Sequence, residues 1–257
     1  MTNRDILRLA MEQSAKDIGC DAEDFLSDGN IVVPFRLGPA AKKYYRLPIG
    51  CSFVSYGNNV VAAAEDGLFD IVKEYVERFD FFHCFETPNM YWLNKRLEPL
   101  GQTVCFMAEY FLPDIGRLKA LPCKYKLRLL EKGAFEELYL PEWSNALCRD
   151  RKQLDVLCVG AYDGGKLIGL AGCSADAEAM RQIGVDVLPE YRRMGVASAV
   201  TSALALEILS RGKVPFYCAA WSNIRSVRNA LRSGFLPAWA EMTVKPTAAA
   251  DEMNADR

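Results

Sequence analysis

Residues 184–197 read Gly-Val-Asp-Val-Leu-Pro-Glu-Tyr-Arg-Arg-Met-Gly-Val-Ala. The first five residues predict a strand, Pro189 ends it, and the residues after Ala197 predict a helix. A strand that leads through a short loop into a helix places that loop at the helix N-terminus. We expect this stretch to decide the fold of the C-terminal half.

The loop has the chemistry of an anion site. The first N–H groups of a helix have no intrahelical acceptor and carry partial positive charge, so they can receive a phosphate group. Gly195 allows turn dihedrals and close approach of a ligand, and Ala197 keeps the next position small. Arg192 or Arg193 can add charge-assisted hydrogen bonds to phosphate oxygens.

The spacing is Arg-x-x-Gly-x-Ala; it is neither a dinucleotide fingerprint, since G-x-G-x-x-G is absent, nor a Walker loop, since no Gly-Lys-Ser/Thr follows. Here the chain resembles the GNAT superfamily of N-acetyltransferases, in which such a loop holds the pyrophosphate of acetyl-CoA. The resemblance implies that acetyl-CoA contacts Arg192, Arg193, Met194, Gly195, Val196 and Ala197.

The sequence around the loop strengthens this resemblance. Gly212 is a predicted helix stop, Val214–Trp221 an apolar strand, and Asn223 a helix cap. In the resembled family an Asn and a Gly-Phe pair stand at the offsets of Asn223 and Gly234-Phe235, and Asn223 is expected beside the cofactor. The resemblance covers roughly residues 124–245.

The expected fold is α/β (α+β): a GNAT-type mixed twisted sheet flanked by helices, preceded by a smaller N-terminal α/β domain. Residues 1–115 form the first domain, 116–246 the acetyltransferase domain and 247–257 a frayed tail. In the second domain, strands are expected at 125–129, 155–162 and 166–173, and short helices at 135–140 and 143–148.

The N-terminal half predicts helices at 4–19, 68–79 and 88–100 and strands at 31–35, 44–54, 60–64, 81–85 and 102–110. This order parallels the C-terminal one and suggests a degenerate repeat, although β-α-β-α-β order also arises without duplication. Glu65 and Asp66 stand where the other half has arginines, so this half is not expected to bind CoA. It would complete the substrate cleft or pack as a structural partner.

Bulk composition excludes several classes. The 257 residues are 51% hydrophobic and 25% charged, as in a water-soluble globular protein, with no apolar run long enough to span a bilayer and no secretion signal. We therefore expect a cytoplasmic protein, monomeric or homodimeric. The nine cysteines are scattered singly and only one histidine is present, so no metal is expected. A pI of about 5.7 disfavours nucleic acid as a partner.

Acetyl transfer needs a neutral amine, oxyanion stabilisation and release of the CoA thiolate. By resemblance, the N–H groups of Val185 and Val187 face the acetyl and pantetheine groups. Strand alternation puts Gln182 and Asp186 on one face, from which the family's general base often comes. Asp186 is the candidate base and Gln182 its polar neighbour. Alternatively, Asp186 caps a loop or pairs with an arginine.

The sequence departs from the family where a tyrosine often acts as general acid, seven residues after Asn223. Ala230 stands there, and Ser226, Tyr217 or a water held by Asn223 could substitute. The candidate residues of the acceptor site are Trp143, Tyr217 and Trp221. Trp143 and Tyr217 could instead belong to the core, whereas Trp221, at the end of its strand, is expected to pack on pantetheine or the acceptor.

The function predicted from these features is acetyl-CoA-dependent N-acetyl transfer to a primary amine, of a small molecule or a peptide, by direct attack in a ternary complex. Ala230 also favours a second hypothesis, a non-catalytic module that senses acyl-CoA. A third hypothesis is a pseudoenzyme with an empty cleft, in which Arg192 and Arg193 are only surface charge. An acyl-cysteine mechanism through Cys173 or Cys218 is rejected, because no histidine lies nearby in the sequence.

Overall fold

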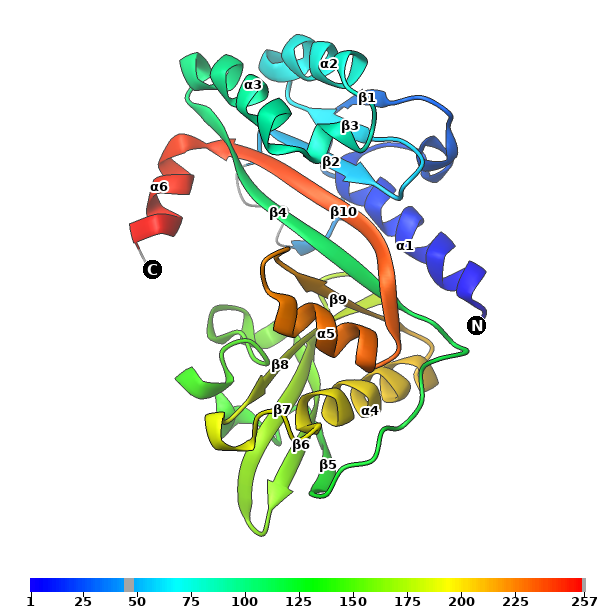
Figure 1. Ribbon diagram of the computed structural model, residues 1–257, viewed down its shortest axis with the longest axis vertical. Coiled ribbons are helices and arrows are strands. Elements are labelled where there is room, and N and C mark those ends of the chain that lie inside the picture. The colour runs from blue at the N-terminus through cyan, green and yellow to red at the C-terminus, as the bar shows by residue number, and fades with distance from the viewer. Residues whose placement is uncertain (44–48, 256–257) are drawn as a thin grey trace. The chain divides into compact units, whose positions relative to one another are not determined.

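A computed structural model of the chain describes residues 1–43 and 49–255 (Figure 1). It divides into two compact units, the first made of Met1–Leu7 and Phe111–Pro237 and the second of Arg8–Tyr110 and Ala238–Arg257. Residues 238–246 belong to the same unit as the N-terminal half, and the domain bounds expected from the sequence stay a prediction.

The first unit holds a sheet of mixed direction in the order β9-β8-β7-β6-β5. Its strands are β5 (Lys126–Glu131), β6 (Asp155–Asp163), β7 (Lys166–Ser174), β8 (Met180–Val187) and β9 (Val214–Ala219), and its helices are α4 (Val196–Ser210) and α5 (Ile224–Arg232). Strands β5 to β8 are paired antiparallel, whereas β8 and β9 are parallel. The α/β class predicted from the sequence is confirmed.

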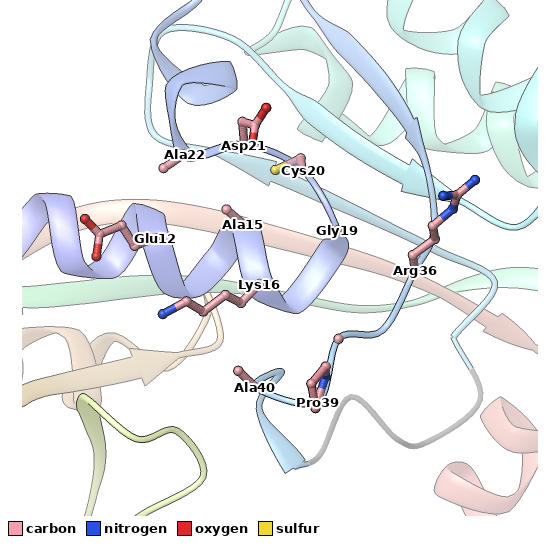
Figure 2. Close-up of a pocket in the computed structure, with 11 residues that line it drawn as sticks. Glu12, Ala15, Lys16, Gly19, Cys20, Asp21, Ala22, Arg36, Pro39 and Ala40 are labelled. Carbon is pink, nitrogen blue, oxygen red and sulfur yellow. The ribbon is translucent and has the colours of Figure 1, made fainter.

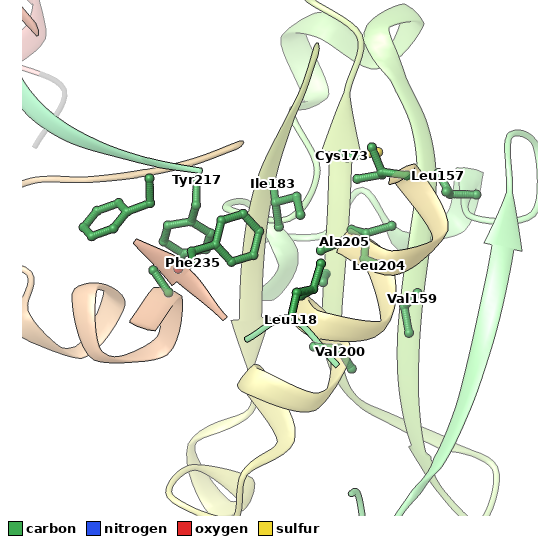
Figure 3. Packing of buried hydrophobic residues seen from close by; sticks show 14 of the residues in the cluster. Leu118, Leu157, Val159, Cys173, Ile183, Val200, Leu204, Ala205, Tyr217 and Phe235 are labelled. Carbon is green, nitrogen blue, oxygen red and sulfur yellow. The ribbon is translucent and has the colours of Figure 1, made fainter. Parts of the chain in front are cut away.

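Helix α4 packs against one face of this sheet, where it contacts β6, β7, β8 and β9. Its buried residues are apolar or small on nearly every side, as expected for a helix between a sheet and a second helix. Figure 3 shows Val200, Leu204 and Ala205 of α4 beside Val159 and Ile183 of the sheet. Burial of such side chains stabilises the fold by about 1.5–3 kcal/mol each.

The opposite face of the sheet is covered by short 3-10 turns, Glu136–Leu138 and Pro141–Trp143. They supply a smaller cluster built around Phe135 and Trp143. The helix expected at 143–148 is not formed beyond Trp143. Residues 145 and 146 instead lie directly on the sheet, as described below.

The second unit contains a sheet in the order β1-β3-β2-β10-β4. Its strands are β1 (Ile31–Pro34), β2 (Cys51–Ser55), β3 (Val61–Ala64), β4 (Gln102–Pro113) and β10 (Phe235–Pro246), of which the last two continue into the first unit. Its helices are α1 (Asn3–Ile18), which also begins in the first unit, α2 (Phe69–Arg78), α3 (Thr87–Leu97) and α6 (Thr247–Ala255). Of the predicted strand 44–54, residues 44–48 lie outside the described part of the chain.

Two predictions for this unit are wrong. Phe81–Phe85 is not a strand, because β1 occupies the place beside β3, and His83–Phe85 instead form a 3-10 turn. The carbonyls of His83 and Cys84 accept hydrogen bonds from the Asn89 amide and the Tyr75 hydroxyl. The tail is also ordered as α6, since alanine is the strongest helix former and the Thr247 N–H is held by the Gly101 carbonyl.

A buried ion cluster lies in the second unit. The Lys42 Nζ is 2.9 Å from Asp17 Oδ2 and 3.7 Å from Glu241 Oε1, and all three side chains are buried. Burial raises the pKa of Asp17, and the charge of Lys42 opposes that rise. A buried ion cluster of this kind adds little net stability, because the cost of removing its charges from water offsets much of their attraction.

We predict that Gly234→Ala destabilises the protein strongly. Gly234 has a φ of +96°, and a Cβ there would lie 2.7 Å from the Leu118 Cα, so both strain and overlap result. The control is Gly164→Ala, which has a φ of +59° and open space around the new Cβ. In chemical denaturation, Gly234→Ala should lower the free energy of unfolding by about 2 kcal/mol or more beyond the loss in the control. Equal losses would contradict this packing.

Candidate functional site

Strands β8 and β9 separate in the middle of the sheet. Their parallel pairing runs from Met180–Val214 to Ile183–Tyr217 and ends there, although β8 continues to Val187. On its other side, β8 stays paired with β7 as far as Val187. The pair Ile183–Tyr217 therefore marks a fork, beyond which the β9-facing edge of β8 is open.

The open edge presents main-chain groups of Val185 and Val187. The Leu188 N–H donates to the Ile168 carbonyl of β7 at 3.0 Å, so even-numbered residues of β8 point their N–H groups toward β7. Odd-numbered residues point toward β9, and Val185 and Val187 have no partner in the β8–β9 register among the described residues. Two N–H groups thus face the fork.

The loop after β8 adopts left-handed backbone at two positions. Gly195 has a φ of 80°, and Arg193, at 63°, is the one non-glycine residue with positive φ in the described part of the chain. A left-handed conformation costs a non-glycine residue about 1–3 kcal/mol and often marks a functional loop. Successive N–H groups in such turns form a concave anion site.

Helix α4 starts at this loop without a side-chain cap. Gly195 is its N-cap residue, and the first bond that closes the helix runs from the Ala199 N–H to the Gly195 carbonyl. The N–H groups of Val196, Ala197 and Ser198 precede that bond and have no intrahelical acceptor. We call the main chain of residues 193–198 the cradle.

Arg192 is partly engaged by the protein itself. Its Nε donates to the Val187 carbonyl at 3.0 Å, which ties the loop to the end of β8. Arg193 is exposed, and Met194 is exposed with its sulfur 3.6 Å from the Tyr125 hydroxyl. Arg192 therefore shapes the loop, while its two other nitrogens and the Arg193 guanidinium make no hydrogen bond with a described residue.

Asp186 holds the segment that covers the other face of the sheet. Its carboxylate accepts hydrogen bonds from the Asn145 N–H at 2.8 Å, the Asn145 side-chain amide at 2.6 Å and the Ala146 N–H at 2.9 Å. The alternative in which Asp186 caps a loop is thus observed. Its role as general base stays a prediction.

Two glycines make room for that segment. Gly172 of β7 and Gly184 of β8 face each other in register. A Cβ on Gly172 would lie 2.1 Å from the Ala146 carbonyl oxygen, and one on Gly184 only 1.8 Å from that of Asn145. We call Gly172, Gly184 and Asp186 the glycine notch. Glycine inside a strand signals such a close approach, and Gly172 and Gly184 are the signal for it in this sequence.

Tyr217 and Ser226 form a hydroxyl pair at the fork. The two oxygens lie 2.8 Å apart, and Tyr217 is 3% exposed. Burial raises the pKa of the Tyr217 hydroxyl above its ordinary value, and its hydrogen bond to Ser226 opposes that rise. Asn223 caps α5 by accepting from the Ser226 N–H at 3.2 Å, so its oxygen fixes the turn that carries Ser226.

The remaining candidate residues occupy different environments. Trp143 is 3% exposed and belongs to the small cluster under the glycine notch, whereas Trp221 is 50% exposed just after β9. Gln182 donates to the Cys218 sulfur at 3.2 Å. Ala230 is fully buried in the core on the inner side of α5. The structure thus places Asp186 and Gln182 on the notch face and Tyr217 on the opposite, α4 face.

A cavity of about 450 Å³ in the second unit is lined mostly by small side chains of α1 and residues 36–40, and Figure 2 shows Arg36 pointing away from Lys16. No group of three or more His, Cys, Asp or Glu among the described residues is arranged to hold a metal. Within the same part of the chain, no helix has both the length and the apolar character to cross a bilayer.

Residues 115–237 match the family model described as GNAT acetyltransferase. That range coincides with the C-terminal part of the first unit and contains the fork, the cradle and the glycine notch. The segment is a domain of the GNAT superfamily. A search of the curated proteins finds no match.

Solved structures resembling the chain include a Novosphingobium aromaticivorans protein assigned to the GNAT family, with 20% identity and a TM-score of 0.42 over 56% of this chain and 66% of that one. A GCN5-related N-acetyltransferase-like protein from Streptococcus suis has 23% identity and a TM-score of 0.46 over 60% and 67%. A GCN5-related N-acetyltransferase from Kribbella flavida has 16% identity and a TM-score of 0.46 over 78% and 88%. The chain spans just under two thirds of the Novosphingobium protein.

We predict that Asp186→Asn loosens the segment on the glycine notch. An amide in place of the carboxylate turns one acceptor into a donor that faces N–H groups, and lost hydrogen bonds to a charged acceptor cost about 1.5–3 kcal/mol. Hydrogen exchange at the Asn145 and Ala146 amides should become faster, with the exchange of core β7 amides less affected. Unchanged protection of both amides would mean that Asp186 does not hold this segment.

Proposed function

We propose that this domain is an acetyl-CoA-dependent N-acetyltransferase that moves the acetyl group to a primary amine, of a small molecule or a peptide, in a ternary complex. The observation that carries the proposal is the adjacency of the open β8 edge and the uncapped cradle. Strand β8 carries the free N–H groups of Val185 and Val187, and the loop after it leads to the N–H groups of residues 196–198 at the start of α4.

The residues of this chain fit acetyl-CoA. The cradle offers several outward N–H groups and two arginines for a pyrophosphate, and no carboxylate lies in residues 191–198. Ala197 and Gly195 leave its floor free of large side chains. Beyond the cradle, the open edge of β8 can pair with an amide-containing chain as a missing strand would.

In the reaction we propose, the amine nitrogen bonds to the thioester carbon, the carbon–sulfur bond breaks, and the products are an N-acetyl amine and free CoA. The N–H groups of Val185 and Val187 stabilise the oxyanion that develops on the carbonyl oxygen. Trp221, exposed beside the fork, contacts the acceptor, and Trp143 supports the segment on the notch from below. One proton leaves the amine and one reaches the sulfur.

For the proton that reaches the sulfur we propose the Tyr217–Ser226 pair. Tyr217 is the last residue of β9 that pairs with β8 before the strands part, and its hydroxyl is hydrogen-bonded to Ser226 of α5. The raised pKa keeps this hydroxyl protonated near neutral pH. It therefore stands in for the acid that Ala230 cannot supply.

For the proton that leaves the amine, Asp186 remains the proposed acceptor, directly or through water, with Gln182 as its neighbour. Because all three of its observed bonds go to the segment on the notch, it also positions that segment. Because these three bonds already engage the Asp186 carboxylate, and because Ala230 is no acid, a second candidate function is a module that binds acyl-CoA without turnover. Catalysis of thiol release separates the two.

The test of the proposed function has two stages. Acetyl-CoA at 100 times its dissociation constant should stabilise the protein by about 2.7 kcal/mol in thermal unfolding. Thiol release across a panel of primary amines should then rise above the rate without amine. Binding without amine-dependent release would support the sensor, and absence of binding would leave neither function standing.

We predict that Arg193→Gly separates backbone strain from binding. Glycine adopts positive φ freely, so the free protein should gain up to about 1–2 kcal/mol of stability. Loss of the guanidinium should weaken CoA binding by roughly 10-fold or more, measured by calorimetry. Arg228→Gly, on the exposed face of α5, is the control for charge. Tighter CoA binding by Arg193→Gly would contradict the assignment.

We predict that Tyr217→Phe lowers kcat by about 10²–10⁴ while the KM for acetyl-CoA changes little, because only a proton donor is lost. Ser226→Ala should have a smaller effect, since the tyrosine hydroxyl remains. In the wild type, activity should persist until pH exceeds the ordinary tyrosine pKa of about 10, because the folded-state pKa is raised. An unchanged kcat in Tyr217→Phe would remove Tyr217 from the mechanism.

A further inference from the structure

A second cavity lies at the C-terminal end of α4, far from the cradle. It has a volume of about 170 Å³ and an apolar floor formed by Leu157, Cys173 and Ile208. Figure 3 shows Leu157 and Cys173 at the end of the apolar cluster away from Val200. Since α4 has 15 residues, its two ends are about 20 Å apart.

The charged residues that line this cavity all carry the same sign: Arg181, Arg211 and Lys213. Arg211 is already neutralised, because its guanidinium pairs with Glu131 and Glu207. Those two carboxylates do not line the cavity. Arg181 and Lys213 have no carboxylate partner among the described residues, so the cavity carries uncompensated positive charge.

Arg181 is fixed by hydrogen bonds from one of its three nitrogens, which leaves the other two available. Its Nη1 donates to the carbonyls of Ala177, Glu178 and Met180, whereas Nε and Nη2 make no hydrogen bond with any described residue. Desolvation lowers the pKa of this guanidinium, which means that its charge is partly withdrawn from water without an anion beside it. A guanidinium so fixed is preorganised for an oxyanion.

The helix end does not cancel this charge. The C-terminal carbonyls of α4 are occupied, since Gly212 N–H donates to Leu209 and Lys213 N–H to Ile208. The Glu207 carbonyl accepts from Arg211 N–H and from the Ser210 hydroxyl. The Cys173 thiol does not compete either, because burial raises its pKa to about 12 and keeps it neutral.

We propose that this cavity is a binding site for a small oxyanion, a phosphate or carboxylate group, held by Arg181 and Lys213 over the apolar floor. The site is independent of acetyl transfer and lies within the same domain. Arg181 supplies a two-pronged contact through Nε and Nη2, and Lys213 supplies a point charge from the start of β9.

The experiment is a titration of the full-length protein with inorganic phosphate at constant ionic strength, followed by amide NMR shifts, with sodium acetate and sodium chloride as parallel arms. The expected result is saturable shifts at residues 208–213 and near Cys173 and Arg181 with phosphate, acetate or both, and none with chloride. Whichever of phosphate and acetate binds more tightly identifies the class of oxyanion. Because the readout is local, binding at the cradle appears separately at residues 193–198.

Lys213→Gln is the main variant, because the Lys213 ammonium forms no ion pair with a described residue and its loss removes only the proposed anion contact. The dissociation constant of this variant for the oxyanion should be about 10-fold higher than that of the wild type. Arg181→Gln should abolish saturation, and Arg228→Gln, with an equal change in net charge, should leave it unchanged. Shifts confined to the cradle, shifts that do not saturate, or equal binding by Lys213→Gln and wild type would overturn the proposal.

Discussion

The parting of β8 from β9 after the pair Ile183–Tyr217 is the constraint on which the rest of the first unit depends. A paired strand would use the N–H groups of Val185 and Val187 internally, and no chain could then lie between the strands. Parting leaves them unsatisfied unless a ligand or water accepts from them. The fold tolerates this because β8 remains fully paired with β7 and α4 packs across both strands.

The same strand organises both faces of the sheet. Its odd-numbered side chains pack under α4, which begins at the cradle that follows β8. Its even-numbered positions form part of the glycine notch, on which Asn145 and Ala146 lie. A change in β8 therefore reaches the cradle, the fork and the covering segment together. A change at Asp186, the proposed proton acceptor, would therefore also disturb the covering segment.

Much of this arrangement was predictable from the sequence, because it rests on local signals. The strand–loop–helix order, the cap at Asn223 and the turn at Gly234 each follow from residue types with strong local preferences. The three bonds of Asp186 were not predictable, because they depend on residues about 40 positions away. The left-handed conformation of Arg193 was also not predictable, because arginine has no preference for positive φ.

In the second unit, prediction failed where tertiary context overrode local preference. The aromatic run at Phe81–Phe85 has high β-propensity, yet β1 fills the sheet position beside β3. The alanine-rich end folds as α6 because Gly101 holds its first residue. The degenerate repeat stays a prediction. The two halves differ in that the parallel neighbour of β3 comes from upstream in the chain, whereas that of β8 comes from downstream.

The most direct measurement is a crystal structure of the protein with CoA bound. The account predicts pyrophosphate oxygens about 2.7–3.2 Å from the main-chain nitrogens of the cradle, and pantetheine amides paired with Val185 and Val187. A cofactor bound elsewhere, or a pyrophosphate held by side chains alone with β8 and β9 closed together, would contradict it.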